Sequence, residues 1–219
     1  MGRTIGPKCK LCRAEGQRLF LRGARCESVK CPFNASEGPR RRTPSKPGAK
    51  MTQRRRRPTE YGRQLREKQK LKRFYGVYER QFRHFYDRAN RMQGNTGVNL
   101  LVLLECRLDN VVFLSGLASS RSQARQFVNH GFIFKDGKRV DIPSYIVDAG
   151  DEFQFKGAKE TLVAVLKENM AQGKSRELPA WLDLSAVASE LKFKVKSRPL
   201  REAVSAPVNE RLIVELCSK

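Results

Sequence analysis

The chain has 219 residues, of which 45 are lysine or arginine and 22 are aspartate or glutamate, so its formal net charge at pH 7 is +23. A protein with this charge attracts polyanions, and nucleic acid is the polyanion we expect. We expect no membrane-spanning segment, because no stretch approaches the ~20 apolar residues that a spanning helix needs, and no secretory signal is visible.

Four cysteines near the start of the chain have the spacing of a metal site. Two residues separate Cys9 from Cys12, and four separate Cys26 from Cys31. Nearby lysines and arginines favour thiolates, and a metal would tie down a segment that has little apolar core. Four sulfur ligands leave no open position, so the site would be structural, with zinc ahead of an iron–sulfur cluster. Two disulfides or four unliganded thiols are the alternatives.

A basic segment follows at residues 38–58. It is rich in proline, glycine and arginine, and it lacks the apolar periodicity of a helix. We expect an extended arm that becomes ordered on RNA through four consecutive arginines, Arg54, Arg55, Arg56 and Arg57.

Apolar side chains at helical spacing then predict two helices. The first is marked by Tyr61, Leu65 and Phe74, and the second by Tyr78, Phe82, Phe85, Tyr86 and Ala89. Such aromatic side chains can stack on bases, but a stripe at this spacing is more often core. We expect three basic residues of the first helix to face RNA: Arg63, Arg66 and Lys70. A break at residues 94–97 precedes the next helical run.

The segment 107–147 predicts two helices, a hairpin and a basic face. Ser120 and Gln123 form a capping box, in which the serine meets the N3 amide and the glutamine reaches back to the cap, so a helix begins at Arg121. Arg121, Arg125 and Asn129 share one face of this helix, opposite its apolar face.

The end of this helix and the turn after it are also predicted by local residues. Gly131 supplies the left-handed stop, and Asp136 with Gly137 favours a tight hairpin turn. We expect a platform whose RNA contacts are Arg107, Arg121, Arg125, Lys138 and Arg139. The alternative is an ordinary surface with solvated charges. Further on, Leu162, Val163, Leu166 and Met170 predict another helix before a break at residues 173–179.

Several motifs resemble the bacterial family of small-subunit ribosomal protein four. They cover nearly the whole chain: the start MGR (1–3) with the four cysteines, LREKQKL (65–71), RLDNVV (107–112), SQARQ (122–126), VDIPSY (140–145) and RLIVEL (211–216). The chain departs from the family pattern at three positions, where Leu114 replaces a common arginine, Ser115 a leucine and Phe132 a histidine.

The resemblance implies an α+β fold with two domains. The first, residues 1–95, would carry the metal knuckle, the arm and a mainly helical part, and residues 197–219 would rejoin it. The second, residues 96–196, would be an inserted RNA-binding domain with helices and a small antiparallel sheet, its core module lying at about residues 107–170.

The resemblance also implies a structural constituent of the small ribosomal subunit in the cytoplasm, with a plastid ribosome as the less favoured location. Such a protein binds the five-prime domain of small-subunit ribosomal RNA early in assembly and organises a helical junction. It contacts ribosomal protein five, near the path by which messenger RNA (mRNA) enters. Some members influence decoding accuracy and repress their own translation. We expect no homo-oligomer.

Two other classes of protein share this kind of domain. The first is an RNA-modifying enzyme, because the sequence from Arg107 to Asp109 imitates a pseudouridine synthase motif with a catalytic aspartate. Here the motif continues differently, and we expect Asp109 to be a surface or capping partner of a neighbouring arginine. His84 and His130 are the only histidines, and we expect no enzyme. The second class is a free RNA-binding regulator, against which the arm and the cysteine segment argue.

Overall fold

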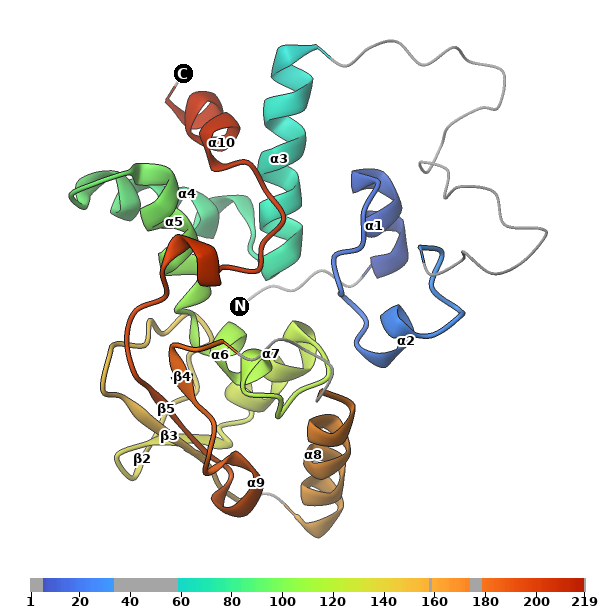
Figure 1. Ribbon diagram of the computed structural model, residues 1–219, viewed down its shortest axis with the longest axis vertical. Helices are drawn as coiled ribbons and strands as arrows, with labels where there is room; N and C mark the ends of the chain where they lie inside the picture. The colour runs from blue at the N-terminus through green and yellow to red at the C-terminus, as the bar shows by residue number, and fades with distance from the viewer. Residues whose placement is uncertain (1–5, 34–58, 158, 174–178, 219) are drawn as a thin grey trace.

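The computed structural model describes residues 6–33, 59–157, 159–173 and 179–218 (Figure 1). The predicted arm, with Arg54, Arg55, Arg56 and Arg57, lies outside these residues. Within them, no helix combines the length and the apolar character needed to cross a membrane.

The fold is α+β, as predicted. The helices are α1 (Lys8–Glu15), α2 (Ala24–Glu27), α3 (Glu60–Tyr75), α4 (Glu79–Arg91), α5 (Thr96–Glu105), α6 (Leu108–Leu114), α7 (Arg121–Asn129), α8 (Glu160–Gly173), α9 (Val187–Glu190), the 3-10 helix η1 (Arg201–Ala203) and α10 (Glu210–Cys217). The strands are β1 (Ile133–Lys135), β2 (Lys138–Arg139), β3 (Glu152–Phe155), β4 (Leu182–Asp183) and β5 (Lys192–Val195). They form one antiparallel sheet in the order β2-β1-β3-β5-β4.

A first core lies among α3, α4, α5 and α10. The predicted aromatic stripe supplies much of it, because Phe74, Phe82 and Phe85 are buried. Two other members of the stripe, Tyr61 and Tyr78, are exposed. The segment from Val204 to Ile213 packs in the same core, so the end of the chain returns to this core, and Figure 1 shows α10 lying beside α3.

The helix α5 belongs to this first core. We expected residues 96–105 to open the inserted domain, but the leucines of α5, among them Leu100 and Leu104, pack with Phe82. A continuous apolar run is attracted to any core, so its sequence does not identify which one it joins. The division between the two cores therefore falls after Glu105.

A second core is formed by α6, α7, α8 and the sheet. Leu108, Val128, Phe153 and Phe193 are almost completely buried in it. The two phenylalanines come from β3 and β5 and are paired across the strands, with ring centroids 5.4 Å apart. In Figure 1, α6 and α7 lie between this sheet and the helices of the first core.

The side chains at the three positions that depart from the family pattern all make contacts within the protein. Leu114 is partly buried against the second core. The Ser115 hydroxyl donates a hydrogen bond to the carbonyl oxygen of Val112 at 2.9 Å, which satisfies this buried polar group. The ring of Phe132 stacks on that of Phe155, with centroids 5.4 Å apart.

Candidate nucleic-acid interface

The helix α7 begins where the sequence predicts. The hydroxyl of Ser120 accepts a hydrogen bond from the backbone N–H of Gln123 at 3.4 Å and caps the helix. The return bond of the expected capping box is shifted by one residue, because Gln123 Oε1 accepts from the Ser119 amide at 2.7 Å and from its hydroxyl at 2.8 Å. These bonds fix the loop before α7 and the direction of its N-terminus.

The end of α7 and the hairpin are built as predicted. Gly131 has φ +73°, and Asp136 and Gly137 have φ +48° and +78°, which are the values of a tight hairpin turn. A Cβ at Gly131 would lie 1.8 Å from Nε of Arg139. Arg139 also donates from a terminal nitrogen to the His130 carbonyl oxygen at 3.4 Å. The glycine therefore lets an arginine from the hairpin lie across the end of α7.

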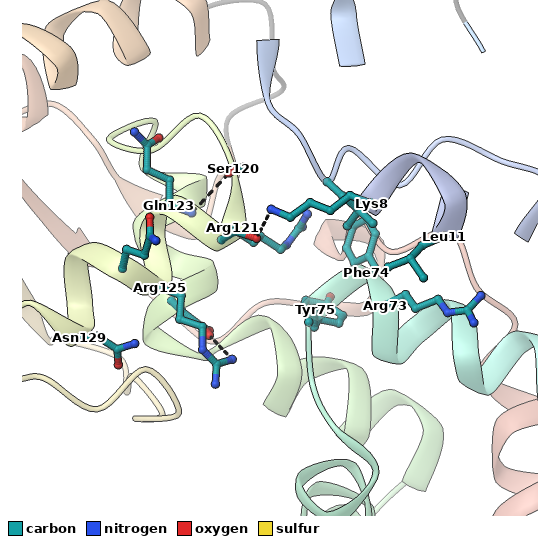
Figure 2. Close-up of a pocket in the computed structure, with 15 residues that line it drawn as sticks. Lys8, Leu11, Arg73, Phe74, Tyr75, Ser120, Arg121, Gln123, Arg125 and Asn129 are labelled. Atoms are coloured by element: carbon teal, nitrogen blue, oxygen red, sulfur yellow. Dashed lines mark hydrogen bonds and ion pairs between the residues drawn. The ribbon is translucent and has the colours of Figure 1, made fainter. Parts of the chain in front are cut away.

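A cavity of about 380 Å³ lies between α1, the end of α3 and α7. Its lining includes Lys8, Arg73, Arg121 and Arg125 as cations, with Asp109 as the one acid among the lining residues. Figure 2 shows that the four cations come from helices that are far apart in the sequence. Polar side chains complete the α7 wall: Ser122, Gln123, Gln126 and Asn129. The excess of cations makes this cavity attractive to phosphate groups.

The segment that carries the four cysteines, residues 6–33, contacts α7 directly. Nζ of Lys8 donates a hydrogen bond to Oγ of Ser122 at 2.6 Å. Gly23, with φ +61°, approaches the loop before α7 so closely that a Cβ there would lie 2.7 Å from the Ser119 carbonyl oxygen. The cysteine segment therefore forms one wall of the cavity.

The other end of α1 is tied to α3. The Glu15 side chain is 1% exposed and forms an ion pair with Arg73. Its carboxylate also lies 3.6 Å from a terminal nitrogen of Arg66. The chain thus uses a buried carboxylate to hold the cysteine segment against two of the basic residues of α3.

A buried charge cluster lies at the cavity, whose lining includes two of its members, Asp109 and Arg125. Arg107 is completely buried and donates from Nε and a terminal nitrogen to the two oxygens of Asp109, at 3.1 and 2.8 Å. Arg125 is 8% exposed, and its guanidinium lies 3.6 Å from Asp109. Burial lowers the pKa of Arg125, and the charge of Asp109 partly offsets this. We predicted an arginine partner for Asp109, and the structure provides two, in the interior rather than on the surface.

Burial changes the interpretation of Arg107. We expected it to contact RNA, but a side chain with no exposed surface cannot do so in this structure. It anchors α6 instead, because the pair with Asp109 joins the residue before this helix to its first turn.

Arg121 is only partly exposed, and its guanidinium packs against aromatic rings. Its central carbon lies 3.9 Å from the ring centroid of Phe74 and 4.5 Å from that of Phe113. Its Nε donates a hydrogen bond to Oδ1 of Asn110 at 2.8 Å. Arg121 and Arg125 both line the cavity, as expected for residues on one helix face. The guanidinium of Arg121, however, contacts Phe74, Phe113 and Asn110 in the protein interior.

The other residues that we expected to contact RNA differ in how exposed their side chains are. Lys138 and Arg139 are exposed on the hairpin, and Arg63 and Arg66 have side chains that are 59% and 53% exposed on α3. Lys70 is different, because its side chain is 12% exposed and its ammonium pairs with Glu67 at 2.5 Å. Sequence reasoning missed Lys8 and Arg73 as cavity residues, since only the folded chain brings them to α7.

The cysteines Cys9, Cys12, Cys26 and Cys31 line one small cavity. No disulfide joins any of the six cysteines, which all lie among the described residues. Burial raises the pKa of Cys12 and Cys26, and the neighbouring cysteines contribute to the rise. Among the residues that the structure describes, no group of three or more His, Cys, Asp or Glu side chains is arranged to hold a metal ion. The thiols share a pocket without forming a closed ligand set.

Comparisons with known proteins cover the whole chain. Residues 3–105 match the family model of the ribosomal protein S4/S9 N-terminal domain, and residues 106–153 match that of the S4 domain. The proteins called small ribosomal subunit protein uS4 of Thermoanaerobacter pseudethanolicus and Thermus thermophilus are 50% and 46% identical to the chain. Protein uS4A of Nitrosomonas europaea is 44% identical. Each alignment spans 219 residues and covers 100% of both chains. The boundary between the two family matches coincides with the division between the two cores.

Proposed function

The chain belongs to the ribosomal protein S4 family, and on this premise we propose that it is a structural constituent of the small ribosomal subunit that binds small-subunit ribosomal RNA. The observation that carries the proposal is the full-length similarity to proteins named for that subunit. The net charge of +23 and the cation-lined cavity support it, because neutralisation of phosphates supplies a large share of the affinity of nucleic-acid-binding proteins.

The mechanism that we propose is recognition of RNA shape by a rigid basic surface. Lys8 at the cavity, with Lys138 and Arg139 on the hairpin, meets phosphates of converging RNA helices. Arg125 lines the cavity but is almost completely buried, so it adds positive charge there without being an exposed contact. Arg63 and Arg66 extend this surface along α3, and the run Arg54 to Arg57 would add four further positive charges. Buried pairs such as Arg107 with Asp109 hold the spacing of the exposed cations without touching RNA.

The four cysteines support a structural zinc ion as part of this proposal. A set of four sulfur donors is the set that zinc prefers in closed sites, and an iron–sulfur cluster is the alternative that the same donors accept. All four thiols line one small pocket, so the ion would draw together donors that share a common space. A bound ion would cross-link the segment that carries Lys8, and Cys9, Cys12, Cys26 and Cys31 would hold it.

We propose that the chain is not an enzyme. Asp109, the residue that imitates a catalytic aspartate, is 4% exposed and is engaged by Arg107 and Arg125. His84 and His130 are both exposed and lie on different helical elements. A buried, paired carboxylate is better suited to holding a fold than to attacking a base.

The family resemblance extends the proposal to partners and finer roles. The chain would bind a junction of the five-prime domain of the RNA early in assembly and would contact ribosomal protein five near the mRNA path. It would act in the cytoplasm and would influence decoding accuracy and its own translation. No homo-oligomer is part of the proposal.

A sedimentation experiment tests the proposed function. An epitope-tagged chain is expressed in a bacterium, and ribosomal particles are separated after a high-salt wash. We expect the tagged chain to sediment with the small subunit, whereas an unrelated tagged protein of similar charge is removed by the wash. Recovery of the tagged chain only at the top of the gradient would contradict the proposal and favour a free RNA-binding regulator.

A further inference from the structure

We propose that Arg121 is a positioning residue, which fixes the orientation of the second core relative to the first and supports RNA binding without contacting RNA. The inference deepens the proposed function and rests on it where RNA affinity is concerned. It departs from the sequence pattern, which makes Arg121 a phosphate contact.

The contacts of Arg121 come from both cores. Phe74 and Tyr75 belong to α3 and to the first core, and their ring centroids lie 3.9 and 5.5 Å from the guanidinium carbon. Phe113 belongs to α6 and to the second core, and its centroid lies at 4.5 Å. These distances are those of cation–π contacts. One guanidinium therefore joins the end of α3 to α6.

The hydrogen bonding of Arg121 points the same way. Its Nε donates to Oδ1 of Asn110, and Nδ2 of Asn110 donates in turn to the Glu105 carbonyl oxygen at 2.9 Å. The Glu105 side chain is completely buried and accepts a hydrogen bond from the Tyr75 hydroxyl. This polar network crosses the stretch of chain after Glu105, where the first core ends and the second begins.

The charges in this network are complementary. Burial raises the pKa of Glu105, and the positive charge of Arg121 opposes the rise. An arginine that binds a phosphate presents its N–H fork to the anion. Arg121 instead directs Nε to Asn110 and packs against the rings of Phe74 and Phe113. Its geometry suits a joint between domains better than an RNA contact.

The consequence for RNA binding follows from the position of the neighbouring cations. Lys8 and Arg73 lie on the first-core side of the cavity, and Arg125 lies on its second-core side. The hairpin belongs to the sheet of the second core. Folded RNA is recognised by shape, so the distance between these groups must stay constant. Removing Arg121 would loosen that distance while leaving the number of phosphate contacts unchanged, and that number sets the salt dependence.

A pair of charge-matched variants tests the inference. Arg121→Met and Lys138→Met each remove one positive charge, and their binding to small-subunit ribosomal RNA is measured across a salt series. We expect Arg121→Met to bind roughly tenfold more weakly at every salt concentration, with the wild-type slope. Lys138→Met should lower the slope by about 0.7 to 0.9 for the phosphate contact that it loses. An equal drop of slope in Arg121→Met would overturn the proposal.

Hydrogen exchange of the free protein gives a second readout, independent of RNA. Arg121→Met should speed amide exchange at the end of α3 and in α6, whereas Lys138→Met should leave both helices as in the wild type. Unchanged exchange in Arg121→Met would contradict a positioning role. If wild-type protein fails to prefer ribosomal RNA, the proposed function fails, but this exchange experiment still decides the role of Arg121.

A conservative variant covers the case in which Arg121→Met does not fold. Arg121→Lys keeps the charge but lacks the planar guanidinium and the Nε donor. We expect it to bind RNA more weakly than the wild type and to speed exchange in the same two helices. Wild-type affinity and exchange in Arg121→Lys would show that charge alone is needed, and would overturn the inference.

Discussion

Arg107 donates two hydrogen bonds to the carboxylate of Asp109, and both side chains are buried. The pair spans the start of α6, and Arg125 of α7 adds a third charge to it. Three charged groups in the interior are tolerated because each one faces an opposite charge. The cluster holds α6 and α7 in register under the basic surface.

Removal of Asp109 tests this cluster. Asp109→Asn leaves the completely buried Arg107 without a counter-charge, and we expect the free energy of unfolding to fall by about 3–5 kcal/mol. Urea unfolding measures the change. Asp141→Asn, at an exposed position, should change the free energy by less than about 0.5 kcal/mol. A similar small change in Asp109→Asn would mean that Arg107 does not depend on its partner.

Substitution of Gly131 tests the contact between α7 and the hairpin. Gly131→Ala strains a positive φ and moves the Arg139 side chain, since the new Cβ would overlap Nε. Gly150→Ala imposes a similar strain at φ +93° and meets no atom within 4 Å. We expect both variants to lose about 1–2 kcal/mol of stability in urea unfolding, but only Gly131→Ala to bind RNA more weakly in a filter assay. Equal RNA affinity in the two variants would remove Arg139 from the interface.

The pH dependence of the contact between α3 and α4 depends on Glu79. Burial opposes ionisation of this side chain, but hydrogen bonds from Lys68 and Lys72 outweigh it and lower its pKa from 4.5 to about 2. Because the folded pKa lies below the unfolded value, the stabilisation is complete above pH 4.5 and is lost as the pH falls from 4.5 towards 2.

Glu79→Gln isolates this effect. The Glu79 side chain is 39% exposed and partly screened, so we expect the variant to be less stable than the wild type by about 1 kcal/mol or less at pH 6, with the difference disappearing near pH 2. Unfolding is followed by circular dichroism at each pH. Glu160→Gln, exposed at the start of α8, serves as the control. A difference that persists unchanged down to pH 2 would contradict the ion pairs.

Metal analysis tests the proposed knuckle. We expect one zinc ion for each purified chain, and less than a tenth of that content in Cys26→Ser. Cys217→Ser should keep the full content, because Cys217 packs against the first core instead of lining the cysteine cavity. Full zinc content in Cys26→Ser would exclude this ligand set, and iron with labile sulfide in place of zinc would favour the cluster.

Local sequence signals predict the elements at the interface well. The start of α7 follows from the Ser120 cap and the hairpin from Asp136 and Gly137, because caps and tight turns depend on a few adjacent residues. The core of the first domain follows from the spacing of Phe74, Phe82 and Phe85.

Contacts between distant segments are what the sequence does not reveal. The spacing of Arg121 and Arg125 places them on one face, but it cannot show that Phe74 and Phe113 cover Arg121. In the same way, the sequence makes Arg107 an expected RNA contact, and only tertiary packing shows that it is buried against Asp109. The side to which α5 packs also depends on the fold, since its leucines would suit either core.

The most direct test of the account is binding of the purified chain to small-subunit ribosomal RNA and to an unrelated RNA of equal length, measured from low to high salt. A basic surface that recognises RNA shape should keep its preference for ribosomal RNA as salt weakens both complexes. Equal affinity for the two RNAs, lost together as salt rises, would show a general polyanion binder and contradict the account.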